Sequence, residues 1–148
     1  MRPFRFSLAG LEKVRQAAVD RAELALARSE AAKRAEEGHI MGLEQAMVSA
    51  ATASSREGVL DVGGLMEEEA YLHQLRHQRS EAMGRLEQWI ASVERERQGL
   101  LQARRERKAL ERLRERRYLE FIKDVVRDEN DVIDEVASVN HQRARQAA

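Results

Sequence analysis

Three side chains near the middle of the sequence have the spacing of a metal site. Glu69, His73 and His77 lie four residues apart, so a helix would place all three on one face, where zinc could bind. The residues between the histidines are Gln-Leu-Arg, whereas a zinc protease needs His-Glu-x-x-His. A solvated polar stripe beside an apolar seam explains the same spacing. We therefore expect no metal ion and no other cofactor.

Other catalytic chemistry lacks its usual pattern. Gly63-Gly64 is not followed by Lys-Ser or Lys-Thr, so it does not predict a phosphate-binding loop. Serines and histidines are present, but two bare helices offer no enclosed pocket that would exclude water from a nucleophile. Thiolate chemistry is excluded because the sequence has no cysteine. We expect a binding protein and not an enzyme.

The composition indicates which elements position these residues. Of 148 residues, 35% are charged and 4% aromatic, and the one proline is Pro3, which is the profile of a long helix or coiled coil. Disorder is the competing interpretation, but 43% of residues are hydrophobic and recur with helical spacing. No window approaches the roughly 20 apolar residues of a membrane span, so we expect a soluble protein. The absence of cysteine fits a reducing compartment such as the cytoplasm.

A first apolar stripe predicts a helix over about residues 7–56. Its spacing alternates between three and four residues, which keeps one seam towards a partner helix. Gly38 and Gly42 weaken this helix, because a glycine inside a helix costs roughly 1 kcal/mol. The stripe consists of Leu8, Leu11, Ala18, Ala22, Ala25, Ala32, Leu43, Ala46 and Ala50.

The pattern then stops, and Gly58, Gly63 and Gly64 predict a turn at about 57–64. A second stripe predicts a helix over about 65–140, followed by a frayed tail. We predict an all-α fold, a single long antiparallel coiled-coil hairpin over residues 1–148 whose C-terminal helix overhangs; a long dimer is the alternative. The second stripe consists of Leu65, Leu72, Leu75, Ala82, Leu86, Trp89, Val93, Leu100, Ala103 and Leu110.

Folding the chain at residue 60 pairs position i with about 120 − i. Leu110 then faces Leu11, and Phe4 and Phe6 lie near Tyr118. Trp89 falls on the seam and is expected to pack there. Tyr71 falls just off the seam near the turn, where an aromatic side chain suits contact with a partner.

The charge distribution carries the clearest functional indication. Residues 104–117 hold eight basic and three acidic side chains, and four basic ones recur every four positions. Like charges at this spacing destabilise a helix by roughly 0.2–0.5 kcal/mol per pair, so we expect this ridge to dock an acidic surface. Nucleic acid fits poorly, since residues 120–135 hold seven acidic and two basic side chains. The ridge consists of Arg104, Lys108, Arg112 and Arg116.

Several of these segments resemble the FliJ family of flagellar export proteins. The opening Phe4-x-Phe6-x-Leu8-x-x-Leu11 with Arg15 is similar to the start of that family. The basic run from Arg107 to Arg117 and the later Asp134-Glu135-Val136-Ala137 follow at similar spacing. The resemblance covers the whole chain and implies a monomeric stalk that inserts into a hexameric export ATPase and stimulates it. It also implies contact with the large membrane subunit of the export gate and with export chaperones, and membrane association only through these partners.

Carried over residue by residue, the resemblance assigns two contact regions. Tyr71 and Leu75 would contact the gate, although Gly38 and Gly42 depart from a bulkier family pattern on the facing helix. A virulence-type secretion stalk, a stand-alone oligomerising scaffold and a basic nucleic-acid-binding helix are the alternatives. The ATPase would contact Phe4, Phe6, Leu8, Leu11, Arg15, Arg104, Arg107, Lys108, Arg112, Arg116 and Arg117.

Overall fold

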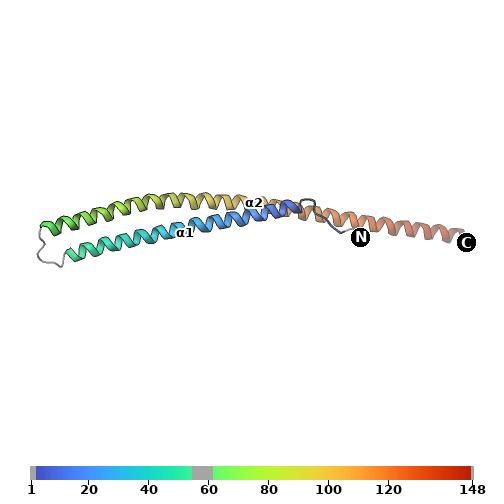
Figure 1. Ribbon diagram of the computed structural model, residues 1–148. Helices are drawn as coiled ribbons and strands as arrows, with labels where there is room; N and C mark the ends of the chain where they lie inside the picture. The colour runs from blue at the N-terminus through green and yellow to red at the C-terminus, as the bar shows by residue number, and fades with distance from the viewer. Residues whose placement is uncertain (1–2, 55–61, 148) are drawn as a thin grey trace. The chain divides into compact units, whose positions relative to one another are not determined.

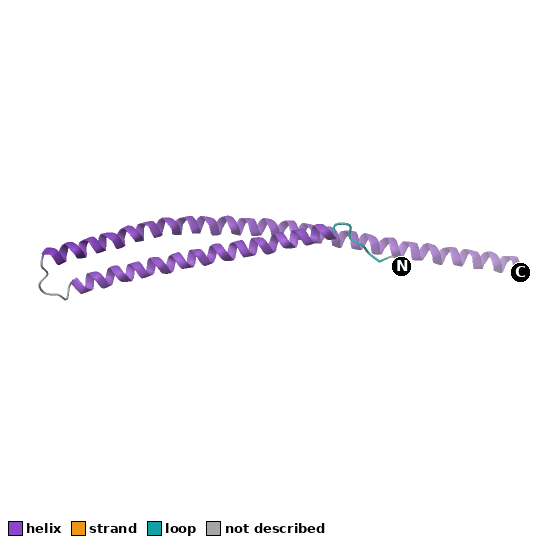
Figure 2. Cartoon of the chain, in the orientation of Figure 1, coloured by secondary structure: helices purple, strands orange, loops and turns teal. Residues whose placement is uncertain are grey.

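Two helices account for nearly all of the computed structural model, which describes residues 3–54 and 62–147. Helix α1 spans Ala9–Ser54 and helix α2 spans Val62–Ala147, and the two run side by side in opposite directions (Figure 1). Residues 3–8 form a short loop ahead of α1, and no strand occurs in the described ranges (Figure 2). The predicted all-α helical hairpin is thus confirmed.

The helix bounds differ slightly from those expected. Residues 57–61 of the expected turn lie outside the described residues, and residues 62–64 belong to the first turn of α2. At the other end α2 continues to Ala147, where we expected a tail beyond about residue 140. No described helix is long and apolar enough to cross a membrane.

The chain divides into two units. The first contains residues 1–18 and 104–148, and the second contains residues 19–103. In the second unit Leu75 and Ala82 of α2 pack against Ile40 and Leu43 of α1 to form an apolar cluster. Val93 and Leu100 are also buried in this unit. With Leu110 of the first unit, half of the ten predicted α2 seam residues are therefore buried.

Alanines and serines allow the helices of this second unit to pack closely. Ala22, Ala25 and Ala32 of the predicted α1 stripe are half-buried. Among them lies the buried Ser29, whose hydroxyl is 3.3 Å from that of Ser92, so the two satisfy one another.

Ion pairs across the second unit flank this core. Arg79 Nη2 lies 2.8 Å from Glu44, and Arg85 donates from Nε and Nη2 to one oxygen of Glu36 at 3.1 and 2.9 Å. The hydrogen bond to Glu36 raises the pKa of Arg85 above its already high ordinary value, so its guanidinium stays charged. The arginine of each pair is open to solvent, although Glu36 is half-buried, so these pairs select the register more than they stabilise the fold.

Some seam assignments need correction. Val19 and Ile40 are buried although the first stripe did not include them, whereas Leu11 and Leu65 are exposed. A strict seven-residue frame drifts by about 20° per heptad relative to a straight helix, which moves such residues across the seam boundary.

Trp89 is 37% exposed, so it is covered less fully than we expected. Trp89 is too large for its surroundings. In the observed register it faces the region of Ala32, and an alanine cannot cover an indole ring.

Candidate partner-binding surface

The first unit brings the N-terminal loop against α2. The Phe4 ring meets Tyr118 edge-on, with ring centroids 5.3 Å apart, and lies 5.5 Å from Phe121. This confirms the expected contact of Phe4 with Tyr118. Phe6 and Leu8 are half-buried, and the Phe6 carbonyl accepts a hydrogen bond from Ala9 N at the start of α1. The aromatic contacts fix the loop on α2.

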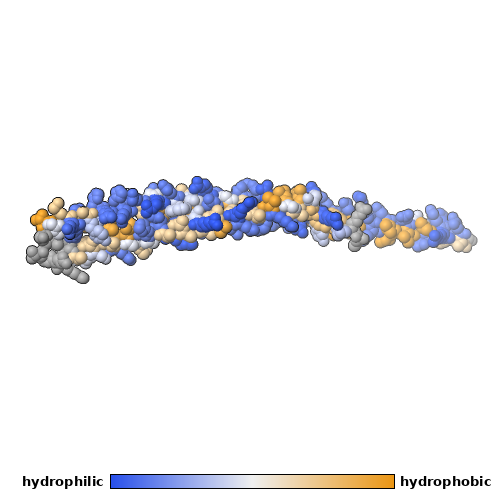
Figure 3. Space-filling view, viewed as in Figure 1, coloured by the Kyte–Doolittle hydropathy of each residue, from blue (hydrophilic) through white to orange (hydrophobic). Residues whose placement is uncertain are grey.

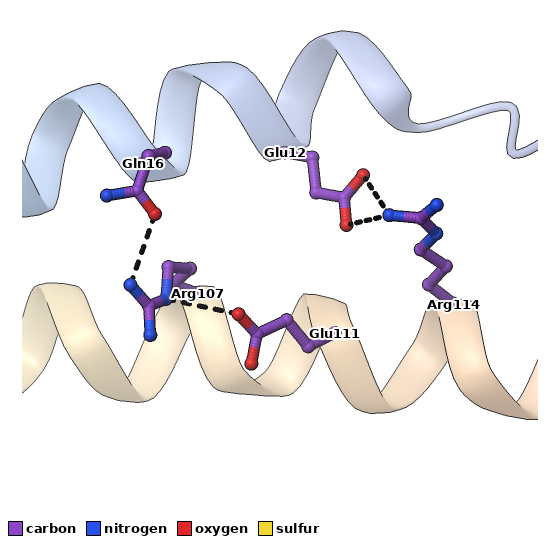
Figure 4. Close-up of polar contacts among 5 residues, drawn as sticks. All are labelled: Glu12, Gln16, Arg107, Glu111 and Arg114. Carbon is purple, nitrogen blue, oxygen red and sulfur yellow. Dashed lines mark hydrogen bonds and ion pairs between the residues drawn. The ribbon is translucent and has the colours of Figure 1, made fainter.

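Several basic side chains of the first unit bind within the hairpin. Arg114 donates from Nη1 to both carboxylate oxygens of Glu12, at 3.1 and 3.4 Å (Figure 4). Glu12 lies in the first turn of α1, where the helix dipole also favours a carboxylate. Arg15 pairs with Glu106, and Arg117 donates to the Ser7 hydroxyl at 3.2 Å. These arginines hold α1 and its loop on α2.

Arg107 is the most enclosed of this group. Its Nη1 donates to Gln16 at 3.1 Å, and its Nε lies 3.2 Å from Glu111 of its own helix (Figure 4). The Nε atom is buried, and its ion pair with Glu111 lacks the geometry of a hydrogen bond. Arg107 is therefore committed to the hairpin and is a poor candidate for a free contact with a partner.

The ridge residues differ from these arginines in their exposure and pairing. Arg104, Lys108, Arg112 and Arg116 are all exposed. Arg104 has a polar partner within the chain. Lys108, Arg112 and Arg116 form no ion pair or side-chain hydrogen bond with any residue that the structure describes. Adjacent residues of one helix thus divide into a paired set facing α1 and three unpaired cations facing solvent.

The two predicted gate-binding residues differ in their exposure to solvent. Tyr71 is exposed, as a partner contact requires. Leu75 is buried in the apolar cluster with Ile40 and Leu43, so its side chain supports the hairpin from inside. Nothing lies within 4 Å of a Cβ added at Gly38 or Gly42 on α1, so neither glycine is needed for helix packing.

The candidate metal residues have other neighbours. Glu69 lies 3.5 Å from Arg76, and His77 Nδ1 lies 3.7 Å from Glu81. Within residues 3–54 and 62–147, no group of three acidic or histidine side chains is arranged to hold a metal ion.

The sequence interpretation missed an apolar face on the C-terminal part of α2. Ile122, Val126, Ile133 and Val136 are exposed along residues 122–147, which we call the overhang. Their spacing was visible in the sequence, because Ile122 and Ile133 are eleven residues apart, as are Val125 and Val136. An eleven-residue repeat escapes a search for heptads.

The structure is that of a coiled-coil hairpin protein with exposed charged and apolar surfaces. Residues 4–146 match the family model of the flagellar FliJ protein. The chain belongs to this family, whose members are structural components of type III export. Comparison with curated protein sequences found no match.

A solved structure has the same fold. It is that of a protein described as a YscO homologue from Chlamydia trachomatis, with a TM-score of 0.62 and 18% sequence identity. The alignment covers 99% of this chain and 100% of that one.

Proposed function

We propose that the chain is a stalk that binds a hexameric export ATPase through the ridge of the first unit and stimulates ATP hydrolysis without itself catalysing a reaction. The observation that carries the proposal is the unpaired state of Lys108, Arg112 and Arg116. Three cations at four-residue spacing repel one another, and none of them forms an ion pair with a residue that the structure describes. An acidic surface on a partner would supply it.

The family supports the choice of partner. Family membership supports a role in flagellar export, and we propose that the chain acts in the cytoplasm as a monomer and approaches the membrane only through its partners. Tyr71 is the proposed contact for the large membrane subunit of the export gate, with export chaperones as further partners. The flagellar family match favours this role over a virulence-type stalk.

A stand-alone oligomerising scaffold is the competing function. A stalk must enter a ring as a single hairpin, whereas a scaffold associates with itself. Sedimentation equilibrium separates the two, because the stalk is expected to show the mass of one chain.

The ridge is tested by direct binding to the assembled ATPase ring. We expect the full chain with Lys108→Glu and Arg112→Glu to bind more weakly, and binding of the unchanged chain to fall as salt is raised, because exposed charges are screened over roughly 8–10 Å. The matched control is Arg21→Glu with Arg28→Glu. It changes the net charge equally, at two exposed residues of α1 that form no ion pair with any residue described by the structure.

Equal loss of binding in both double variants would show that net charge, and not the ridge, governs association. Unchanged binding in the ridge variant would show that the ATPase grips another surface.

A further inference from the structure

The overhang presents an apolar face that the described residues of the first unit leave largely exposed. The exposed fractions are 49% for Val126, 63% for Ile133 and 54% for Val136. Apolar surface appears on this part of α2 in Figure 3. At 100° per residue these side chains share one side of the helix. The face, which we call the overhang face, consists of Ile122, Val125, Val126, Val132, Ile133, Val136 and Val139.

One flank of this face is acidic. Five carboxylates fall within an arc of about 80° beside the apolar side chains. A sixth, Glu129, lies within the face itself, and Asp134 lies on the opposite flank with Lys123 and Arg127. None of the seven acidic residues has an ion-pair or hydrogen-bond partner among the residues described. The flanking set is Glu120, Asp124, Asp128, Asp131 and Glu135.

The packing of the N-terminal loop indicates which kinds of side chain bind to this side of α2. Tyr118 shares a helix face with Ile122 and Val125, and Tyr118 and Phe121 are the residues on which Phe4 packs. Phe4 is followed by the exposed Arg5 and then by Phe6, so the segment that packs beside the start of the overhang face alternates aromatic and basic residues. The overhang face extends the α2 surface on which Phe4 packs, but the N-terminal loop does not cover it.

We propose that the overhang face binds an amphipathic helix of a partner protein whose apolar stripe is bordered by lysine and arginine. The apolar stripe would cover the valines and isoleucines, and the basic border would neutralise the five flanking carboxylates. A second copy of the overhang is a poor occupant, because residues 120–135 of each copy hold seven acidic and two basic side chains, and two such acidic segments repel each other.

Helix energetics also favour an external partner. An isolated helix is marginal in water, and most helical stability in proteins comes from packing of an apolar face. The β-branched residues of the overhang lower its intrinsic helix propensity further. A helix that covers this face would therefore stabilise the overhang as it binds.

Two synthetic probes test the proposal with the full chain. The first is a helical peptide of about 20 residues, long enough to cover residues 122–139, with leucine on one face and lysine on both flanks. The second has glutamate in place of every lysine. Calorimetry should show binding of the lysine peptide at least about tenfold tighter than binding of the glutamate peptide. Amide exchange in residues 122–139 should slow when the lysine peptide binds.

Two pairs of substitutions locate the binding surface. Ile133→Ser with Val136→Ser should weaken binding of the lysine peptide by roughly tenfold or more, because both exposed side chains lose their apolar contact. Met41→Ser with Val48→Ser is the matched control, since both residues are apolar and equally exposed on α1. The control should leave the affinity unchanged. The hairpin melting temperature should not change with the overhang pair, because these side chains make no contact with α1.

Three outcomes would overturn the proposal. Equal affinity for the two peptides would show that charge complementarity does not contribute to binding. Equal loss of affinity in both serine pairs would show that the peptide does not bind specifically at the overhang face. A chain that sediments as a dimer, and returns to a monomer with Ile133→Ser and Val136→Ser, would show that a second copy covers the face. The probes contain no ATPase, so these outcomes are independent of ATPase binding by the ridge.

Discussion

Replacing Leu110 by alanine should destabilise the hairpin more than the same change at Leu101. Leu110 is 7% exposed and Leu101 is 42% exposed. Leu→Ala removes three carbons, and each carbon withdrawn from water contributes about 0.8 kcal/mol. At Leu110 nearly all of this contribution is lost, and an unfilled cavity adds to it, so we expect a cost of about 2–3 kcal/mol. At Leu101 solvent already reaches the side chain, and we expect about 1 kcal/mol.

Circular dichroism on heating and in urea measures this difference. For a chain of this size 1 kcal/mol corresponds to roughly 2–4 °C, so Leu110→Ala should melt at least about 3 °C below Leu101→Ala. Leu119→Ala is a second control, because Leu119 is 58% exposed and lies in the same unit as Leu110. Equal losses at all three positions would show that Leu110 is not in the interface between the helices.

Three further predictions concern stability and dynamics. Gly38→Ala and Gly42→Ala should each raise the free energy of unfolding by about 0.5–1 kcal/mol in urea titrations, because both positions are helical and have room for a Cβ; a loss of stability would mean that a close contact was overlooked. Glu12→Gln should lower it by about 1 kcal/mol, since the side chain of Glu12 is 24% exposed but that of its partner Arg114 is 55% exposed; a much larger loss would make this pair a main support of the first unit. Amides of residues 122–147 should exchange faster than those around Leu75 and Val93, because only the latter are packed; equal protection would mean that the free overhang is already covered.

The sequence predicts the helices well because their signal is repeated many times. Apolar residues at three- and four-residue spacing on both sides of a glycine-containing break predict two antiparallel helices. The predicted register is also close. We expected the residue numbers of facing residues to sum to about 120. Those of Ser29–Ser92 and Phe4–Tyr118 sum to 121 and 122.

Residue types could not predict which basic side chains of residues 104–117 are paired within the hairpin and which are unpaired. Arg107 and Lys108 are neighbours with the same charge, yet Arg107 binds Gln16 and Lys108 binds no partner within residues 3–54 and 62–147. One residue corresponds to a rotation of about 100° around the helix, so a small change in register exchanges the paired and unpaired positions. The Ser29–Ser92 contact was missed for a related reason, because polar residues do not contribute to an apolar stripe.

The most direct test of the proposed function is the rate of ATP hydrolysis by the hexameric export ATPase with the full chain added. The unchanged chain and the Arg21→Glu/Arg28→Glu control should both raise the rate. Lys108→Glu/Arg112→Glu should raise it much less, while its melting temperature stays the same or increases, because mixed charges relieve the repulsion along the helix. If this ridge variant unfolds at a clearly lower temperature and still stimulates the ATPase fully, the ridge is a structural element of the hairpin and the stalk engages the ring elsewhere.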